Sequence, residues 1–212
     1  MSARRSAIDP RPEPRELRAR GQRTRERLLD AGAHVFADRG YHAARVDDIV
    51  KLAETSHGTF YLYFANKEEL FHALAEQVAS RLETLARALP PLTPGADGRR
   101  ALTGWMEQFH RLYADAGPII QAWTEAEIVA SDVGKLATTV WAAFTRALID
   151  RIRATSALGL DPAVAALAIV AMIERANYYV LSGQVGVDGD AVVHTLARVT
   201  HAAIFGPPNT DS

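Results

Sequence analysis

Two short helical patterns separated by only three residues constrain the fold of this chain most strongly. The first covers about Val46 to Ala53, and the second covers about His57 to Phe64. The intervening Glu54-Thr55-Ser56 has room only for a tight turn, and Ser56 is a suitable N-cap for the second helix. Two short helices joined in this way after a longer supporting helix predict a helix-turn-helix.

The remainder of the chain also follows helical periodicity. The supporting helix is expected to begin near Thr24 and to end at Gly40, because glycine readily adopts the left-handed conformation at a helix end. Asn66 and Glu69 have the spacing of a capping box and predict the start of the next helix. Further helices are predicted at about 66–89, 99–114, 117–131, 133–156, 162–182 and 189–205.

No stretch alternates with period two between hairpin turns, so the sequence predicts an all-α protein of about nine helices. We expect a three-helix DNA-binding domain at 23–66 and a larger ligand-binding and dimerisation domain at 67–206. A short tail is expected at 207–212. Residues 1–22 contain Pro10, Pro12 and Pro14 together with many arginines, which is typical of a disordered basic arm. Such an arm either adds phosphate contacts or is a solubilising tail, and both alternatives remain open.

Charge is distributed unevenly along the chain. Residues 1–67 contain 13 Lys/Arg and 9 Asp/Glu, whereas residues 68–212 contain 11 and 16. A basic N-terminal third joined to an acidic remainder favours a nucleic-acid-binding head on a separate body. Cysteine is absent, which excludes disulfides and thiolate metal sites. The N-terminus lacks a signal-peptide pattern, and no apolar run approaches the ~20 residues of a membrane span. We therefore expect a cytoplasmic protein without a membrane partner.

Four sequence blocks together resemble the DNA-binding domain of the TetR (TetR/AcrR) family of bacterial transcriptional regulators. They are Phe36-Ala37-Asp38-Arg39-Gly40-Tyr41, Val46-Asp47-Asp48-Ile49, Ser56-His57-Gly58-Thr59-Phe60-Tyr61-Leu62-Tyr63-Phe64 and Asn66-Lys67-Glu68-Glu69-Leu70. The resemblance spans about fifty residues without a gap. It implies a dimeric regulator in which a helical body senses a ligand. The chain departs from the family pattern at the turn residues Glu54 and Thr55, and at Arg45, which replaces the usual threonine cap.

The second short helix has the composition expected of a DNA-recognition helix. Its N-terminal end is short and polar, and Gly58 allows close approach of the backbone. We expect Phe60 and Phe64 to point into the core. The resemblance implies DNA contacts at Thr59, Tyr61, Tyr63 and Lys67, and base readout at His57. Arg45 can reach a phosphate or a groove edge. The predicted DNA-binding set is Arg45, Val46, Ser56, His57, Gly58, Thr59, Tyr61, Tyr63 and Lys67.

The last two predicted helices are candidates for a dimer interface. The helix at 162–182 is apolar almost all round, so it needs more cover than one body supplies. The resemblance implies that these helices pack against their mates as a four-helix bundle, and an intramolecular core is the alternative. The predicted interface residues are Val164, Leu167, Val192, Leu196 and Val199.

Large aromatic residues and a few polar ones in the body predict a cavity for an apolar or aromatic effector, such as an acyl chain. The alternative is that these aromatics simply fill the core. The histidines do not form a metal-spaced set with carboxylates, so neither a metal nor a cofactor is expected. The predicted ligand-binding residues are Trp105, Met106, Phe109, Tyr113, Trp123, Trp141, Thr145, Glu174, Asn177 and Tyr178.

The function expected from these features is a dimeric repressor that binds a palindromic operator and is released by a small apolar ligand. A ligand-insensitive repressor or an activator of the same fold remains an alternative. An enzyme is not expected, because no nucleophile–base pair or phosphate-binding loop is evident. A helical scaffold for another protein is a further alternative.

Overall fold

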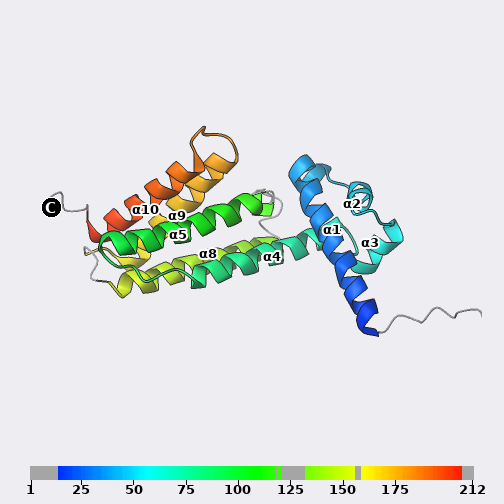
Figure 1. Cartoon of the computed structure of the whole chain (residues 1–212), viewed down its shortest axis with the longest axis horizontal. Helices are drawn as coiled ribbons and strands as arrows, with labels where there is room; N and C mark the ends of the chain where they lie inside the picture. The colour runs from blue at the N-terminus through cyan, green and yellow to red at the C-terminus, as the bar shows by residue number, and fades with distance from the viewer. Residues whose placement is uncertain (1–13, 118, 121–131, 156–158, 207–212) are drawn as a thin grey trace, which may run out of the picture. The chain divides into compact units, whose positions relative to one another are not determined.

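The computed structural model describes residues 14–117, 119–120, 132–155 and 159–206, and all regular structure within these ranges is α-helical (Figure 1). The prediction of an all-α fold is confirmed. The described residues form eight helices rather than about nine, because the helix expected at 117–131 lies largely outside them. The helices are α1 (Pro14–Ala43), α2 (Val46–Leu52), α3 (His57–Tyr63), α4 (Lys67–Arg87), α5 (Gly95–Asp115), α8 (Asp132–Arg153), α9 (Pro162–Leu181) and α10 (Gly189–Phe205).

The first helix begins well before the predicted boundary. It starts at Pro14, so the prediction of disorder up to residue 22 is wrong for 14–22. Proline is tolerated in the first turn of a helix, and the following residues are mostly Arg, Glu, Leu and Ala, which are strong helix formers. Thr24 is not an N-cap, because its hydroxyl donates to the Arg20 carbonyl oxygen within α1. Gly40 has φ 73°, so helical geometry is interrupted where the sequence indicated.

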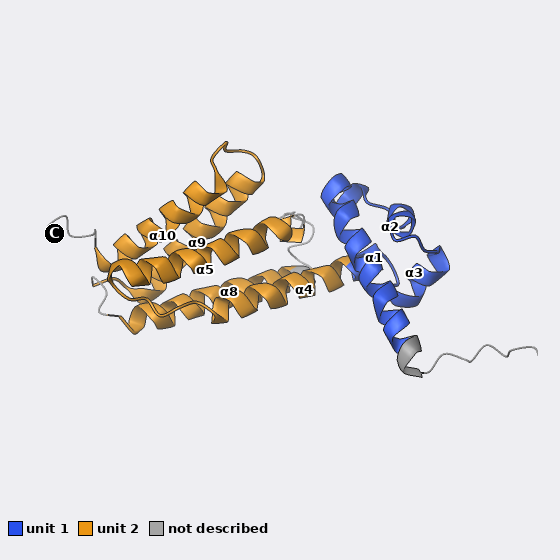
Figure 2. Ribbon diagram, viewed as in Figure 1, with its two compact units in different colours: residues 1–70 blue, residues 71–212 orange. Residues whose placement is uncertain are grey.

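The chain divides into two compact units, residues 1–70 and 71–212 (Figure 2). The division lies a few residues after the expected domain boundary at 66/67. The helix α4 begins in the first unit and continues into the second. We refer to these as unit 1 and unit 2 and describe each separately.

Unit 1 is built around a small apolar core to which all of its helices contribute. Leu28, Ile49, Phe60 and Leu70 are fully buried, and they come from α1, α2, α3 and the start of α4. Gly32 in α1 makes room for Leu70, because a Cβ at Gly32 would lie 2.3 Å from a Leu70 methyl group. This core fixes the orientation of α3 within unit 1.

Unit 2 is a helical bundle with a largely aromatic interior. Within it, α5 packs against α10, and α9 packs against both α8 and α10. Trp105, Phe109 and Phe144 are buried and form a cluster with ring centroids 5.6–6.1 Å apart. The N-caps Asp161 and Asp188 accept backbone N–H bonds at the starts of α9 and α10. The predicted limits of these two helices are therefore confirmed to within a residue or two.

The helix α9 is unusually apolar for its exposure. It has 20 residues and a mean hydropathy of 1.4. By length and composition alone, it is long and apolar enough to cross a membrane. The helix is not an uninterrupted apolar run, because it contains Glu174 and Arg175. Only 22% of the apolar window is buried within the chain, which leaves much of its surface uncovered.

Candidate nucleic-acid interface and internal cavity

The turn between α2 and α3 is short and closely hydrogen-bonded. Ala53 N–H donates to the Ile49 carbonyl oxygen and Thr55 N–H to that of Val50, at 2.8 and 3.0 Å. Glu54 lies between them with φ 49°, a left-handed conformation that is uncommon for a residue other than glycine. Backbone hydrogen bonds on both sides of Glu54 hold this conformation. The predicted helix-turn-helix geometry is therefore present.

The helix α3 has two distinct faces. Phe60 is 0% exposed and Phe64, just after the helix, is 2% exposed, so both belong to the core as predicted. On the opposite face, Tyr61 is 57% exposed and Leu62 is 81% exposed. Leu62 was not among the predicted DNA-binding residues. Its position could have been inferred, because a residue two positions from each buried phenylalanine lies on the other side of a helix.

The N-terminus of α3 is capped as the sequence predicts. Ser56 Oγ accepts a hydrogen bond from Thr59 N–H at 3.1 Å and lies 2.9 Å from Thr59 Oγ1. The predicted contact residue Gly58 is not needed for packing within the chain. A Cβ at Gly58 would find nothing nearer than Ser56 Oγ at 3.8 Å, so packing within the chain does not require glycine there. Glycine inside a helix is nevertheless destabilising by roughly 1 kcal/mol relative to alanine.

His57 contacts Asp47, and this contact links the beginning of α3 to α2. Its Nε2 atom lies 3.0 Å from Asp47 Oδ1, and both side chains are more than half exposed. Because a carboxylate only accepts hydrogen bonds, Nε2 carries the proton in this pair. When Nε2 alone carries a proton, Nδ1 is a hydrogen-bond acceptor.

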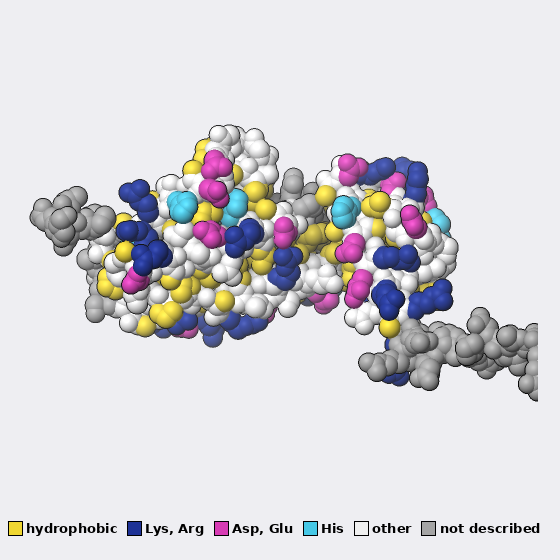
Figure 3. Space-filling view, in the orientation of Figure 1, with side chains coloured by type: hydrophobic (Ala, Val, Ile, Leu, Met, Phe, Trp, Pro, Cys, Tyr) yellow, Lys and Arg dark blue, Asp and Glu magenta, His cyan; other side chains and the backbone are white. Residues whose placement is uncertain are grey.

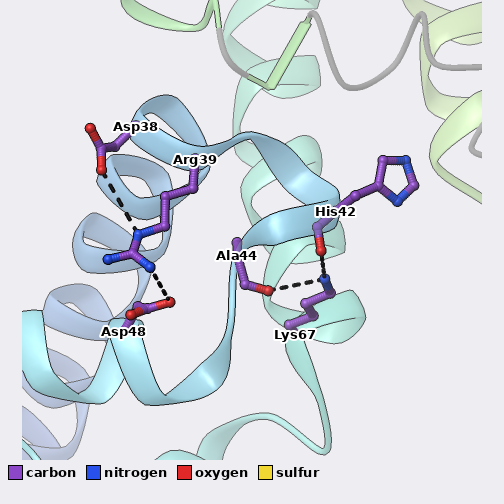
Figure 4. A network of polar contacts seen from close by, with 6 residues as sticks. All are labelled: Asp38, Arg39, His42, Ala44, Asp48 and Lys67. Carbon is purple, nitrogen blue, oxygen red and sulfur yellow. Dashed lines mark hydrogen bonds and ion pairs between the residues drawn. The ribbon is translucent and has the colours of Figure 1, made fainter.

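Lys67 is engaged by backbone groups of its own unit (Figure 4). Its ammonium group donates to the carbonyl oxygens of Tyr41, His42 and Ala44 at 3.0, 3.2 and 3.1 Å. It also lies 4.8 Å from the centroid of the Tyr41 ring. An ammonium group has three N–H donors, and all three are used in these contacts. The sequence-based assignment of Lys67 to a phosphate is therefore at odds with this geometry, which favours a structural role at the α1–α2 connection.

A second polar contact joins the same two helices (Figure 4). Arg39 near the end of α1 lies 3.2 Å from Asp48 of α2 and 3.9 Å from Asp38. Asp48 is partly buried, so its pairing with Arg39 contributes more than a fully exposed pair would. Together with Lys67, it fixes α2 against α1.

The remaining predicted DNA-binding residues lie in less uniform surroundings. Arg45 is exposed and precedes α2 without capping it, as the sequence indicated. Val46 is half-buried. Tyr63 is also half-buried, and a Cβ at Gly21 would lie 3.3 Å from its hydroxyl, so the ring lies beside α1. Figure 3 shows basic and acidic side chains interspersed on the visible face of unit 1, so the whole unit is not uniformly cationic.

The predicted ligand-binding residues of α5 are core residues. Trp105, Met106 and Phe109 are each at most 6% exposed. Trp105 Nε1 donates to the Leu85 carbonyl oxygen at 2.9 Å, which ties α5 to α4. None of the three lines the cavity described below. These three residues therefore support the alternative in which the aromatic side chains fill the core rather than line a ligand site. Trp123 lies outside the described residues.

Two parallel polar contacts connect α5 and α9 through this apolar interior. The Tyr113 hydroxyl donates to Glu174 Oε1 at 3.1 Å, and His110 Nδ1 lies 2.7 Å from Asn177 Oδ1. The Asn177 amide also donates to the Ile173 carbonyl oxygen at 2.7 Å. Tyr113, Glu174 and Asn177 were predicted to bind a ligand, but these polar groups are paired within the chain. His110 was not assigned from the sequence, because its partner is distant along the chain.

Burial raises the pKa of the Tyr113 hydroxyl well above its usual range, and the neighbouring Glu174 carboxylate raises it further. The native state therefore keeps this proton, whereas the unfolded chain loses it near pH 10. This contribution to stability is complete below about pH 10 and declines as the pH rises toward the native pKa. We expect Tyr113→Phe to reduce the loss of stability between pH 9 and 11, measured by urea unfolding. An unchanged pH dependence in Tyr113→Phe would contradict this assignment.

A cavity of about 300 Å³ lies beside α8 and α9. It brings together three predicted ligand-binding residues, Trp141, Thr145 and Glu174. Tyr178 does not line it and instead lies 5.0 Å from the Arg175 guanidinium. The walls are mostly apolar, with polarity contributed by Thr145, Glu174 and Arg175. The other lining residues are Ile120, Ala137, Leu167, Val170 and Ala171.

The predicted dimer residues fall into two groups. Val164 and Leu167 on α9 and Val199 on α10 are 66%, 63% and 46% exposed, which is high for apolar side chains of a packed helix. Val192 is half-buried and Leu196 is buried within the chain. Leu196 therefore packs in the core of its own chain.

The known proteins that this chain is similar to are bacterial regulators of transcription. Residues 28–74 match the family described as bacterial regulatory proteins, tetR family. The chain is 41% identical over 73 residues to the HTH-type transcriptional regulator YdgC of Bacillus subtilis, covering 34% of this chain and 37% of that protein. It is 29% identical over 210 residues to the HTH-type transcriptional activator FasR of Mycolicibacterium smegmatis, covering 94% and 88%.

A solved structure shows that the likeness extends to the fold. The transcriptional regulator FadR from Bacillus subtilis, in complex with stearoyl-CoA, superposes with a TM-score of 0.63 at 21% identity. The match covers 84% of this chain and 98% of FadR. By contrast, the alignment with YdgC spans little more than a third of that relative's length. The strong sequence similarity is thus concentrated in the helix-turn-helix, and the helical body is shared as a fold.

Proposed function

Because the chain belongs to the TetR family of bacterial transcriptional regulators, we propose that it binds a palindromic operator as a homodimer and represses transcription until a small apolar effector binds. The residues proposed to contact DNA lie on the exposed side of α3 and at the start of α2. The protein would act in the cytoplasm, where its operator DNA is found.

The observation that carries this proposal is the contrast between the two faces of α3. One face is fixed by Phe60, while the other presents Tyr61 and Leu62 with little cover from the chain itself. An apolar side chain that is 81% exposed is suited to contact thymine methyl groups in the major groove. The glycine at 58, which internal packing does not require, supports close approach of the backbone to DNA.

His57 supplies a basis for base selection. In the tautomer that donates from Nε2 to Asp47, Nδ1 is left as an acceptor. Adenine N6 and cytosine N4 are the donors that the major groove displays. This supports readout of adenine or cytosine by His57, with Arg45 contributing a phosphate contact in place of Lys67.

The uncovered apolar surface of α9 and α10 supports dimerisation. Val164, Leu167 and Val199 supply its exposed apolar side chains. A two-fold dimer would place the two copies of α3 on half-sites about one helical turn of DNA apart. Leu196 is assigned to the intramolecular core rather than to the interface.

The cavity beside α8 and α9 is the proposed effector site. Its apolar walls and the polar ends at Thr145, Glu174 and Arg175 suit a ligand with an apolar chain and one polar group. The FadR structure contains stearoyl-CoA, which supports an acyl compound as the first class to examine. The effector must bind the DNA-released conformation better than the DNA-bound one, because equal affinity would shift nothing. A coupling of about 1–3 kcal/mol would weaken operator binding by roughly 5–150-fold.

A specific observation keeps activation as a second candidate function. FasR, which aligns over nearly the whole chain, is named a transcriptional activator. In this second function, operator binding by the protein activates transcription of the adjacent gene. A reporter gene under the selected operator distinguishes the two, because deletion of the protein raises expression under a repressor and lowers it under an activator.

The DNA-binding proposal is tested by selecting duplexes from a random pool and measuring their affinity for the protein. We expect a two-fold symmetric sequence to be enriched and Tyr61→Ala to bind it about 5–150-fold more weakly, because a groove contact is worth about 1–3 kcal/mol. Leu52→Ala is the control, since Leu52 is an exposed apolar residue of unit 1 outside α3. Absence of any enriched duplex would overturn the proposal, as would equal losses in the two variants.

A further inference from the structure

A second groove in unit 2, distinct from the proposed effector cavity, is cationic. It has a volume of about 380 Å³ and is bordered by Arg87 of α4 together with Arg146 and Arg151 of α8. Asp150 is the only acidic residue among its lining groups, and the rest are Ala86, Ala143 and Ala147. Among the lining residues, three guanidinium groups stand against one carboxylate, so the lining is net positive.

The positive charge of this groove is opposite in sign to the net charge of unit 2. Residues 71–212 contain 11 Lys/Arg and 14 Asp/Glu, so unit 2 is acidic as a whole. Convergence of three arginines on one groove is therefore not a by-product of a basic surface. Because the alanine side chains are small, they leave space in the groove for a group with several oxygen atoms to reach the guanidinium groups.

The three arginines differ in how they are held. Arg151 donates from Nε and Nη2 to the Leu89 carbonyl oxygen at 3.1 and 2.8 Å, which fixes the plane of its guanidinium group. Arg87 donates to Thr84 Oγ1 at 3.1 Å and lies 3.6 Å from Glu83. Within the described residues, the Arg146 side chain makes neither a hydrogen bond nor an ion pair, and it is exposed. The groove thus combines a pre-oriented guanidinium group with one that has unused donors.

We propose that this groove binds a small molecule through a phosphate-ester or pyrophosphate group. Planar guanidinium groups form paired N–H bonds to phosphate oxygens, and arginine is the usual residue for such recognition. A group with two or more negative charges can engage several arginines at once. A single carboxylate carries only one negative charge and would neutralise less of the charge of the three arginines. The volume lies within the ~300–1,000 Å³ typical of small-molecule sites.

The site does not depend on the proposed function, because all of its residues lie in unit 2 and none belongs to the DNA-binding surface. The probe is inorganic pyrophosphate, titrated into the full chain by calorimetry at constant ionic strength without DNA. We expect saturable binding with one site per chain. Citrate at matched ionic strength is expected to bind at least tenfold more weakly.

Two variants with opposite expected changes in pyrophosphate affinity, and one control variant, test the site. Arg146→Ala is expected to weaken pyrophosphate binding at least tenfold, and Asp150→Asn to strengthen it several-fold by removing the opposing charge. Arg153→Ala removes an exposed arginine of the same helix outside the groove and is expected to change nothing. Absence of saturable binding would overturn the site, as would equal weakening by Arg146→Ala and Arg153→Ala. Citrate binding as tight as pyrophosphate binding would overturn the assignment to phosphate.

Discussion

Replacing Phe60 with alanine is expected to unfold unit 1 under conditions in which the wild type is stable. The ring is 0% exposed and lies 5.8 Å from that of Phe64, so its removal leaves a cavity that the small core of unit 1 cannot readily close. Substitutions of this kind cost about 3–5 kcal/mol, a large fraction of the ~5–15 kcal/mol that stabilises a typical domain. The loss is measured by urea unfolding followed through circular dichroism.

The adjacent tyrosine provides the matched control for Phe60→Ala. Tyr61 is also aromatic and on α3, but it is 57% exposed, so we expect Tyr61→Ala to change the free energy of unfolding by less than about 1 kcal/mol. Both variants are expected to lose DNA binding, one because unit 1 unfolds and the other because a contact is removed. Comparable stability of Phe60→Ala and Tyr61→Ala would contradict the assignment of opposite faces to α3.

Lys67→Met is expected to destabilise unit 1 by about 2–3 kcal/mol. The change removes three charge-assisted hydrogen bonds to carbonyl oxygens at the α1–α2 connection. The expected cost is below the sum of three such bonds because the site is partly exposed and water can replace some of them. Lys51→Met is the control, since Lys51 is exposed on α2. Urea unfolding measures both variants.

The salt dependence of DNA binding distinguishes this structural role from a phosphate contact. Loss of one phosphate contact lowers the slope of log Kobs against log salt concentration by about 1. With Lys67 engaged by three carbonyl oxygens, we expect Lys67→Met to leave that slope unchanged under conditions in which the variant is folded. A reduced slope without loss of stability would instead support the phosphate contact implied by the family resemblance.

The local architecture of the DNA-binding head was predictable because its signals are short in range. The Ser56 cap, the tight turn and the spacing of Phe60 and Phe64 all depend on residues a few positions apart. The Asn66 cap is also confirmed, through its bond to the Glu69 amide. The start of α1 was missed because three prolines were taken to exclude a helix, although the last of them begins it.

The contacts that the sequence did not reveal join residues far apart along the chain. Lys67 and its carbonyl partners are separated by more than twenty residues, and His110 and Asn177 by 67. An aromatic stripe on a helix is compatible with either a core or a cavity wall. Only packing shows that Trp105 and Phe109 fill the interior whereas Trp141 borders a cavity.

The three hydrogen bonds of Lys67 also make this residue a natural reporter of local opening. The chain contains only three lysines, Lys51, Lys67 and Lys135. An amine must release its proton and its hydrogen bonds before it can attack an acylating reagent, so Lys67 reacts only after its ammonium group leaves the three carbonyl oxygens. Its rate of acylation relative to the exposed Lys51, read by mass spectrometry, therefore reports how often these side-chain contacts break in the native protein. The same measurement with operator DNA bound would show how far DNA slows the breaking of these contacts.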